Sequence, residues 1–340
     1  MGRSSVFSLE QVYRRQLTKN WTDIFDPFIY IKSINPVQAA GPAFGYFAGG
    51  VSPTYSSVTQ VQRIDYANDT TAVALKGSLS VDQSRGGGTG NNNYGYCLGG
   101  DTPYPSSTVQ RTDYANDNST ASVKGSLAAA GAYFNSVGNI NYGYTGGRSG
   151  NWPSVPNNYS MIDRVDYSND TVTATITNPT GFSPDAYNNY GAVGNQNFGY
   201  FVGGQTFNYG TTSWVRRLDY ASDSEATVLK GPITLQSDGI TAATGNANFG
   251  YLNANNYGNT GSKIDRIDYA NDTATAQTKG SLTWAGNRKA ATGSKDFGYF
   301  SGGGFPESTR VDRIDYSSDT GTASPKGPLD FVVRDHQGFS

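Results

Sequence analysis

The sequence predicts an all-β fold, a six-bladed β-propeller of four-stranded blades behind a short N-terminal segment with one helix and one strand. Three observations support this prediction: one set of motifs recurs six times, each copy reads as four short strands, and no repeat has helical spacing over a useful length. The first motif is an aromatic residue followed by Gly-Tyr. Its six copies begin at Phe44, Tyr94, Tyr142, Phe198, Phe249 and Phe297. The period of about 50 residues is too long for a tetratricopeptide or ankyrin array.

Three further motifs follow each triplet in the same order. A glycine pair follows five triplets, and Asn253-Ala254 takes its place in the fifth copy. An Arg-x-Asp-Tyr motif comes next in all copies, beginning at Arg63, Arg111, Arg164, Arg217, Arg266 and Arg313. A Lys-Gly pair then closes five copies, and Asn178-Pro179 stands there in the third. Each copy is therefore expected to fold as the same structural unit.

The sixth copy illustrates the expected strands. Residues 290–292 are predicted to form the first strand, 297–300 the second, 311–316 the third and 320–325 the fourth. Residues 293–296 and 317–319 are expected to be turns, because Gly, Ser and Asp interrupt the alternation of apolar and polar residues there. Four strands in each of six units predict a propeller, in which radial packing leaves only short, protected edges.

The composition of each strand fits its expected place in the ring. Small residues, as at 242–244, suit a first strand in the crowded centre. Large rings such as Phe198, Tyr200 and Phe201 are expected to fill the wider space between neighbouring sheets, where each buries roughly 150–250 Å². Thr/Ala-rich segments such as 273–276 are predicted to be half-exposed fourth strands at the outer edge.

The repeats resemble known families. The order of apolar strand, Gly-Gly, variable loop, Tyr-bearing strand and closing Gly-Pro resembles the kelch repeat from about residue 39 to 329, without the Trp that kelch repeats usually carry on the fourth strand. The phrase Phe-Gly-Tyr-Phe-x-Gly-Gly with Arg-Ile-Asp-Tyr-Ala-Asn-Asp-Thr (63–70) is similar to repeats in virion-associated proteins of tailed phages that infect marine cyanobacteria. The resemblance implies a particle component and leaves its position in the particle open.

Residues 1–38 depart from the repeat pattern and are predicted to be an anchoring segment, with the propeller over 39–340. Ser8-Leu9-Glu10-Gln11 resembles a capping box that begins a helix to about Lys19, and 28–31 reads as a strand. The segment is too short to bury its own apolar residues, so it either docks on another protein or packs on the propeller, and docking is favoured. The residues expected to anchor it are Leu9, Val12, Tyr13, Leu17, Trp21, Phe25 and Phe28.

Two segments could close the ring by supplying the first strand of the first blade. Residues 38–41 resemble that strand but are shorter than its counterparts. The C-terminal tail, 331–340, falls at the register where the next first strand would lie. The tail is the favoured choice, because kelch-like rings often close with such a borrowed strand.

Composition excludes several function classes. The formal net charge of −2 and a pI of about 5.4 argue against a nucleic-acid binder, which needs a basic face. The single cysteine, Cys97, cannot form an internal disulfide and is expected in the core. The single histidine, His336, excludes a metal site or mechanism that needs two, and it is predicted to be a surface or closure residue. No apolar run approaches the roughly 20 residues that span a bilayer, and the N-terminus lacks the apolar core of a signal peptide.

Each motif that suggests chemistry also has a structural explanation. The Arg-x-Asp motifs could form an arginine cluster for an anionic sugar, but a motif present in every blade is expected to be scaffold, with each arginine paired to an aspartate between blades. The Asp-rich stretch 65–69 lacks the spacing of a calcium loop and is expected to be a turn. The glycine-rich stretch 86–90 is followed by no Lys-Ser/Thr, so no phosphate loop is expected. No cofactor and no metal are predicted.

The loops from the glycine pair to the Arg-x-Asp-Tyr strand vary in length and nearly all carry an aromatic residue. Antiparallel order places these loops on the same face as the links between blades, and loops on a rigid scaffold are common binding sites. These rings are predicted to contact a partner or a glycan, with the alternative that they fold back over their own blades. The residues are Tyr55, Tyr104, Trp152, Tyr159, Phe207, Tyr209, Tyr257 and Phe305.

Three functions follow as expectations. The favoured one is a non-enzymatic virion structural protein of a tailed phage, a tail, fibre or baseplate component made in the host cytoplasm and present in multiple copies. Residues 1–38 would bind other virion proteins, and the propeller would face outward toward a host-surface glycan or protein. The alternative is a lectin-like propeller that recognises host envelope glycans. The third, a glycan-cleaving enzyme, needs two carboxylates about 5–10 Å apart in one pocket. No nucleic-acid partner and no membrane insertion are expected.

Overall fold

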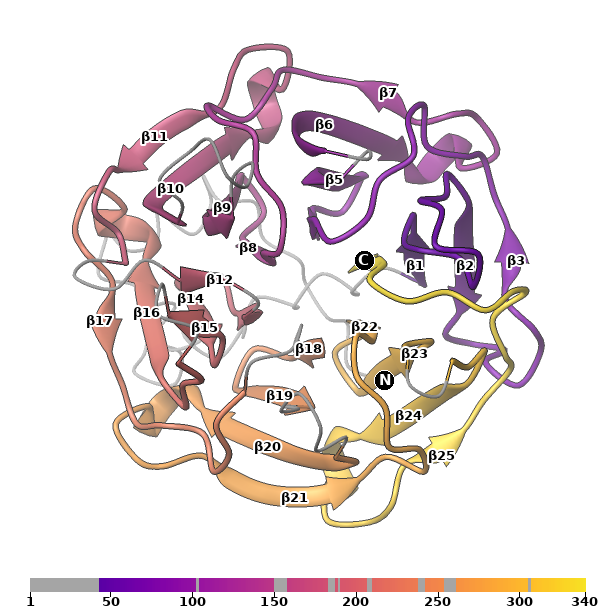
Figure 1. The fold of residues 1–340 in the computed structure, drawn as a ribbon. Helices are drawn as coiled ribbons and strands as arrows, with labels where there is room; N and C mark the ends of the chain where they lie inside the picture. Colours follow the sequence, from indigo (N-terminus) through magenta and orange to yellow (C-terminus); the bar gives the residue numbers. More distant parts are fainter. Residues whose placement is uncertain are drawn as a thin grey trace, which may run out of the picture. The chain divides into compact units, whose positions relative to one another are not determined.

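The computed structural model describes residues 43–101, 104–149, 158–182, 187–188, 190–206, 210–237, 242–253, 261–304 and 307–340, and for 148–149, 158–159 and 187–188 it describes the backbone alone. These residues form a six-bladed β-propeller of four-stranded antiparallel blades, which confirms the predicted fold class (Figure 1). The anchoring segment 1–38, with its predicted helix, strand and anchoring residues, lies outside the described residues. Within the described part of the chain, no helix combines the length and the apolar character needed to cross a membrane.

Each blade begins with its innermost strand at the axis and ends with its outermost strand. From the axis outward, blade 1 contains β26 (Gln337–Phe339), β1 (Phe44–Ala48), β2 (Val61–Asp65) and β3 (Ala74–Leu75). Blade 2 contains β4 (Gly87–Gly90), β5 (Tyr94–Asp101), β6 (Pro105–Asp113) and β7 (Ser122–Val123). Blade 3 contains β8 (Ser136–Gly138), β9 (Tyr142–Ser149), β10 (Asn158–Asp166) and β11 (Thr175–Asn178).

Blades 4 to 6 repeat this order. Blade 4 contains β13 (Gly191–Gly194), β14 (Phe198–Val202), β16 (Val215–Asp219) and β17 (Val228–Leu229). Blade 5 contains β18 (Ala242–Gly245), β19 (Phe249–Asn253), β20 (Lys263–Asp268) and β21 (Gln277–Ser281). Blade 6 contains β22 (Ala290–Gly293), β23 (Phe297–Ser301), β24 (Val311–Asp315) and β25 (Ser324–Pro325). A separate two-stranded sheet pairs β12 (Tyr187–Asn188) with β15 (Gln205–Thr206).

The first three strands of the sixth copy lie where the motifs predict them, and the fourth is shorter. β25 covers only the last two of the six residues predicted for it, 320–325. In the fifth copy the prediction of a strand at 273–276 is wrong, because β21 begins at Gln277, directly after the predicted segment ends. The small and hydroxylated residues before each outermost strand instead belong to the turn that leads out of the third strand, where their side chains compete for local backbone hydrogen bonds.

The C-terminal tail closes the ring, as predicted. β26 is the innermost strand of blade 1 and pairs antiparallel with β1, with Tyr46 opposite Phe339 and Ala48 opposite Gln337. The central residue of β26, Gly338, lies so close to the neighbouring inner strand that an added Cβ would collide with the backbone carbonyl of Ala291. Only glycine fits this point, so the sequence Gln-Gly-Phe suits a closing strand pressed between blades 6 and 2.

The third strand of blades 2 to 6 ends in a 3₁₀ turn capped by the aspartate of the Arg-x-Asp-Tyr motif. In blade 2, the Asp113 carboxylate accepts a 3.0 Å hydrogen bond from the Ala115 amide and thereby starts the turn. The turns are η1 (Tyr114–Asn116), η2 (Tyr167–Asn169), η3 (Tyr220–Ser222), η4 (Tyr269–Asn271) and η5 (Tyr316–Ser318). Blade 1 has a hydrogen-bonded turn in this place, with the same cap from Asp65 to the amide of Ala67. The motif aspartate therefore serves the local backbone.

A second aspartate, at the end of each turn, joins neighbouring blades, and we call these six residues the junction aspartates. Their members are Asp69, Asp117, Asp170, Asp223, Asp272 and Asp319. Each carboxylate accepts a hydrogen bond from a tyrosine hydroxyl at 2.8–3.0 Å and another from an arginine Nη1 at 2.7–2.8 Å, and both donors belong to the preceding blade. The last pair, Arg313 of blade 6 with Asp69 of blade 1, completes the circle. The prediction that the arginines pair with aspartates between blades is confirmed.

Aromatic rings extend each junction into the space between sheets. The tyrosine of each Arg-x-Asp-Tyr motif stacks on the buried tyrosine of the preceding blade, as Tyr269 does on Tyr200 with ring centroids 4.9 Å apart. Each motif arginine also lies over the first aromatic ring of its own blade, as Arg217 does over Phe198 at 4.4 Å. These contacts use the repeated residues within the scaffold, which leaves the departures from the repeat as candidates for function.

The junction from blade 3 to blade 4 has fewer donors than the other five. In those five, a lysine of the Lys-Gly pair lies 3.1–3.5 Å from the junction aspartate, and the glycine amide donates to the aspartate's backbone carbonyl. Asn178-Pro179 occupies this place in blade 3, so the repeat supplies no lysine to Asp223, and proline has no amide hydrogen to give. The Asp223 side chain is accordingly 15% exposed, against 7% for Asp272.

Candidate functional site

The face that carries the second-to-third-strand loops and the links between blades is called the variable-loop face. Tyr55, in the loop between β1 and β2, is 75% exposed there, and Tyr104, at the tip of the β5–β6 hairpin, is 72% exposed. Both side chains are therefore largely exposed to solvent, and their contact with a partner or a glycan stays a prediction. Tyr159 lies in β10, and of this residue the structure describes the backbone alone. The other predicted residues of this face lie outside the described residues: Trp152, Phe207, Tyr209, Tyr257 and Phe305.

Four residues in neighbouring blades have an unusual backbone conformation and form a row of hydrogen bonds on this face, which we call the backbone arc. Arg85, Tyr133, Arg288 and Asp335 each precede an innermost strand, and each has a positive φ of 55–63°. A non-glycine residue in this left-handed conformation costs roughly 1–2 kcal/mol. The neighbouring blades hold one another in it through three backbone hydrogen bonds of 2.7–3.1 Å, which run from Asp335 to Arg288, from Arg85 to Asp335 and from Tyr133 to Arg85. Backbone strain of this kind is common at functional sites, where the surrounding structure holds the strained residues in place.

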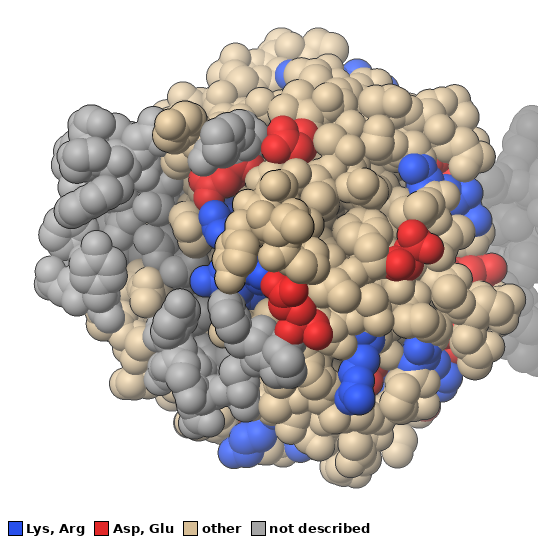
Figure 2. All heavy atoms as spheres, turned by 45° about the vertical axis from the view of Figure 1, so that its right-hand side comes forward, with Lys and Arg blue, Asp and Glu red and all other residues tan. Residues whose placement is uncertain are grey.

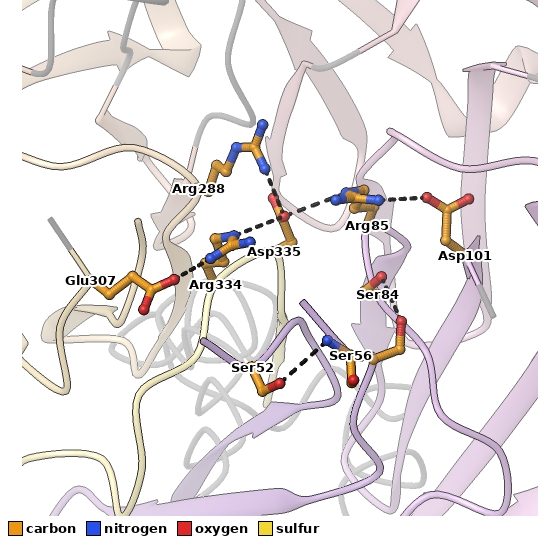
Figure 3. Close-up of polar contacts among 10 residues, drawn as sticks. Ser52, Ser56, Ser84, Arg85, Asp101, Arg288, Glu307, Arg334 and Asp335 are labelled. Carbon is orange, nitrogen blue, oxygen red and sulfur yellow. Dashed lines mark hydrogen bonds and ion pairs between the residues drawn. The ribbon is translucent and has the colours of Figure 1, made fainter. Parts of the chain in front are cut away.

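Three arginines and three carboxylates meet at and beside this backbone arc, and we call them the rim cluster: Arg85, Asp101, Arg288, Glu307, Arg334 and Asp335. Figure 3 shows Asp335 in the middle of the cluster. Its Oδ2 lies 3.1 Å from Arg288 Nη1 and 3.4 Å from Arg85 Nε. Arg85 continues to Asp101 at 2.9 Å, and Arg334 pairs with Glu307 (Figure 3). The cluster joins blades 6, 1 and 2, where the chain closes the ring.

The rim cluster is electrically balanced. Burial acts against the charge of Arg85, but the carboxylates of Asp335 and Asp101 outweigh it and raise the pKa of the guanidinium. Burial raises the pKa of Asp101, and Arg85 offsets only part of this effect. With three positive and three negative groups, the cluster has no formal charge left for an ionic ligand. Figure 2 likewise shows acidic and basic residues next to one another on a mainly uncharged surface.

The rim cluster was not predicted from the sequence, because its members belong to no recurring motif. A usable signal exists, since Arg85, Tyr133 and Arg288 each stand five positions before the glycine that ends a first strand. Asp335 has the same spacing from Ser340, which takes the place of that glycine in the closing strand. Four side chains at one register, in blades that are neighbours in the ring, predict a common location at the axis.

The central channel of about 220 Å³ is lined by the six innermost strands. The described residues of its lining are mostly Gly, Ala, Ser, Thr and Val, with the charged Lys289 and the single histidine, His336, and they include no Asp or Glu. A pair of catalytic carboxylate side chains is therefore not found among the described channel residues, and the expectation that the chain is not an enzyme stays a prediction.

His336 and Lys289 are buried, and both have structural partners. His336 Nε2 lies 2.9 Å from the hydroxyl of Ser301, and burial lowers the pKa of the imidazole to about 3. Ser301 is itself buried, and this serine–histidine contact ties the closing segment to blade 6. The closure role predicted for His336 is confirmed and the surface location is wrong. Burial lowers the pKa of Lys289 to about 7, while its Nζ donates to Asn253, the residue that replaces glycine in the fifth copy.

The structure also bears on metal ligands and on Cys97. Among the described residues, no group of three or more His, Cys, Asp or Glu side chains could hold a metal ion. Cys97 is buried, as expected for a core residue, and burial raises the pKa of its thiol.

No protein-family model matches the chain, and no curated protein matches it.

Proposed function

We propose that the chain is a non-enzymatic structural protein of a tailed-phage particle, a component of the tail, fibre or baseplate. Residues 1–38 dock on other virion proteins, and the propeller faces outward, so that the variable-loop face contacts the host surface or a protein. The resemblance of the repeats to virion-associated phage proteins supports the location, and a propeller is a suitable scaffold for protein or ligand binding.

One observation supports this function above the others: the described departures from sixfold repetition gather mainly on one face. The rim cluster and the two exposed tyrosines lie on the variable-loop face, whereas the repeated arginines, lysines and aspartates join the blades. A rigid ring that presents variable loops on one side is suited to binding, and multiple copies in one particle would add avidity.

The test separates the two parts of the proposal. Particles are assembled in infected host cells with the full chain, with a chain that lacks residues 1–38, and with the full chain carrying Tyr104→Ala. The truncated chain is expected to be missing from purified particles although it folds, as judged by circular dichroism. Tyr104→Ala is expected to keep full occupancy and to weaken adsorption to host cells. Full occupancy of the truncated chain would contradict anchoring by residues 1–38.

A further inference from the structure

The loop that carries Tyr55 is fixed in place before any ligand arrives. Val51 is bridged on one side to Ser57 and on the other to Arg334 of the closing segment. Within the loop, the Ser52 amide donates to the Ser56 carbonyl and the Tyr55 amide to the Ser52 carbonyl, both at 2.9 Å. Tyr55 has a φ of 63°, which an exposed aromatic residue rarely adopts. The loop therefore holds a large ring in solvent at a conformational cost, which is typical of a contact residue.

One face of the Tyr55 ring is covered and the other is open. The guanidinium of Arg334 lies over the ring at 4.6 Å from its centroid, and Arg334 is only 2% exposed. Because the tyrosine is 75% exposed, the opposite face of the ring meets solvent. The same guanidinium pairs with Glu307, whose carboxylate is about a third exposed, and the hydroxyls of Ser52 and Thr54 lie in the Tyr55 loop. The exposed aromatic ring is thus linked through Arg334 to a partly exposed carboxylate, and its loop carries two hydroxyl groups that lie 2.9 Å from each other.

The charges around this surface select the class of ligand. A cationic ligand is disfavoured, because Arg334 already occupies one face of the ring and a second positive charge would compete for the same π electrons. An anionic ligand is disfavoured, because the arginines of the rim cluster are balanced by its carboxylates and Glu307 is the most exposed of these. An uncharged ring with an apolar face and hydroxyl edges fits both conditions, since its C–H groups pack on the negative face of the aromatic ring.

We infer that Tyr55, Glu307, Ser52 and Thr54 form a subsite for an uncharged pyranose of a surface glycan, and we call these four residues the Tyr55 subsite. The sugar stacks on the open face of Tyr55, and its hydroxyls donate to the Glu307 carboxylate. Arg334 is a positioning residue that holds the ring and the carboxylate at a fixed separation. The inference rests on the proposed outward-facing role of the variable-loop face, and it names the substrate class and the place where that face binds it.

The experiment uses the full chain on an array of immobilised neutral, sialylated and uronic-acid glycans, followed by solution titration of the best neutral glycan. Tyr55→Asn removes the ring and suits the left-handed backbone, so the loop should keep its shape. It is expected to weaken binding roughly tenfold, as loss of one stacking contact does, and Tyr55→Trp is expected to retain binding. The matched control is Ile140→Asn, an exposed residue in the β8–β9 turn on the opposite face, which should change the affinity less than twofold.

The outcomes separate this inference from the proposed function. A flat array, preference for acidic glycans, or equal affinity of Tyr55→Asn and the unaltered chain would each overturn the Tyr55 subsite. If the full chain still adsorbs to host cells in any of these cases, and Tyr104→Ala weakens that adsorption, the proposed function stands without the glycan. Absence of the full chain from purified particles would instead overturn the proposed function, whatever the array shows.

Discussion

The same substitution at two equivalent junction aspartates, Asp272→Asn and Asp223→Asn, should have different costs. Asp272 accepts Tyr200 at 2.9 Å and Arg217 at 2.8 Å on one oxygen, and Lys230 lies 3.1 Å from the other. An asparagine keeps one accepting oxygen and directs its amide hydrogens toward a donor. At Asp223 the repeat supplies no lysine to the second oxygen, so asparagine can accept from the tyrosine and the arginine and leave its amide toward solvent.

The magnitudes follow from burial and from the number of donors left unpaired. Removing one partner of a buried ion pair costs about 3–5 kcal/mol, and the lower end applies to Asp272 because Arg217 is a quarter exposed. Asp272→Asn is therefore expected to lower the free energy of unfolding by about 3 kcal/mol. Asp223→Asn weakens two charge-assisted hydrogen bonds without stranding a lysine, and about 1 kcal/mol is expected.

Urea unfolding followed by circular dichroism measures both values, and the comparison between the two variants cancels the common effect of removing a carboxylate. Equal destabilisation, or a larger loss at Asp223, would refute the reasoning. A second readout is pH. Burial acts to raise the pKa of Asp272, but hydrogen bonds from Lys230 and Tyr200 outweigh it and lower the pKa. The Asp272 carboxylate contributes its full stabilisation above its unfolded-state pKa near 4, and this stabilisation is lost as pH falls through the lower pKa of the folded state. The free energy of unfolding of Asp272→Asn should therefore fall less steeply than that of the unaltered chain as pH decreases below pH ~4.

Three further predictions concern ring closure and the buried tyrosines. Burial lowers the pKa of His336 from 6.5 to about 3, so as pH falls from about 6.5 to about 3 the unfolded chain binds a proton that the folded chain does not, and the free energy of unfolding should fall by on the order of 5 kcal/mol. His336→Gln should flatten the pH profile of the melting temperature, and an unchanged slope would contradict this. Gly338→Ala places a methyl group against a carbonyl of β22 and should cost about 1–3 kcal/mol in urea unfolding, with no loss if the inner strands can separate. Tyr316→Phe removes a hydroxyl that is hydrogen-bonded to the inner strand of blade 5 and should lower the free energy of unfolding by about 1 kcal/mol. Tyr114→Phe removes a buried hydroxyl that has no partner among the described residues, and it should leave the stability unchanged. Equal melting temperatures of the two variants would contradict this difference.

The fold was predictable because its information is repeated. Six copies of one motif set predict six equal units. In each unit, short runs of alternating apolar and polar residues, separated by turns rich in Gly and Asn, predict four strands. The prediction of arginine–aspartate pairing between blades also followed from repetition. The identity of the acidic partner did not, because each copy offers two aspartates four residues apart, such as Asp65 and Asp69, and only the turn after the third strand directs the second toward the preceding blade.

The candidate site was less predictable, because its residues occur once. Tyr55 was identified from its place in a variable loop, but the ion pairs beneath it depend on Arg334, which is near in space only after the tail closes the ring. The same closure explains why the Tyr114 hydroxyl has no partner among the described residues, since Phe339 occupies the position that Thr89, Thr244 or Thr292 holds in other inner strands. Local sequence patterns do not contain such long-range pairings.

The junction aspartates also bear on how the propeller tolerates the exchange of one repeat for another. Each repeat contains the aspartate that its predecessor binds and, apart from the third copy, the full donor set for its successor. Recombination between repeats can therefore exchange one exposed loop for another while every joint keeps its partners. The residues that join the blades are thus separate from the loops that differ between repeats, so a loop can change its sequence and length while the ring of blades stays intact.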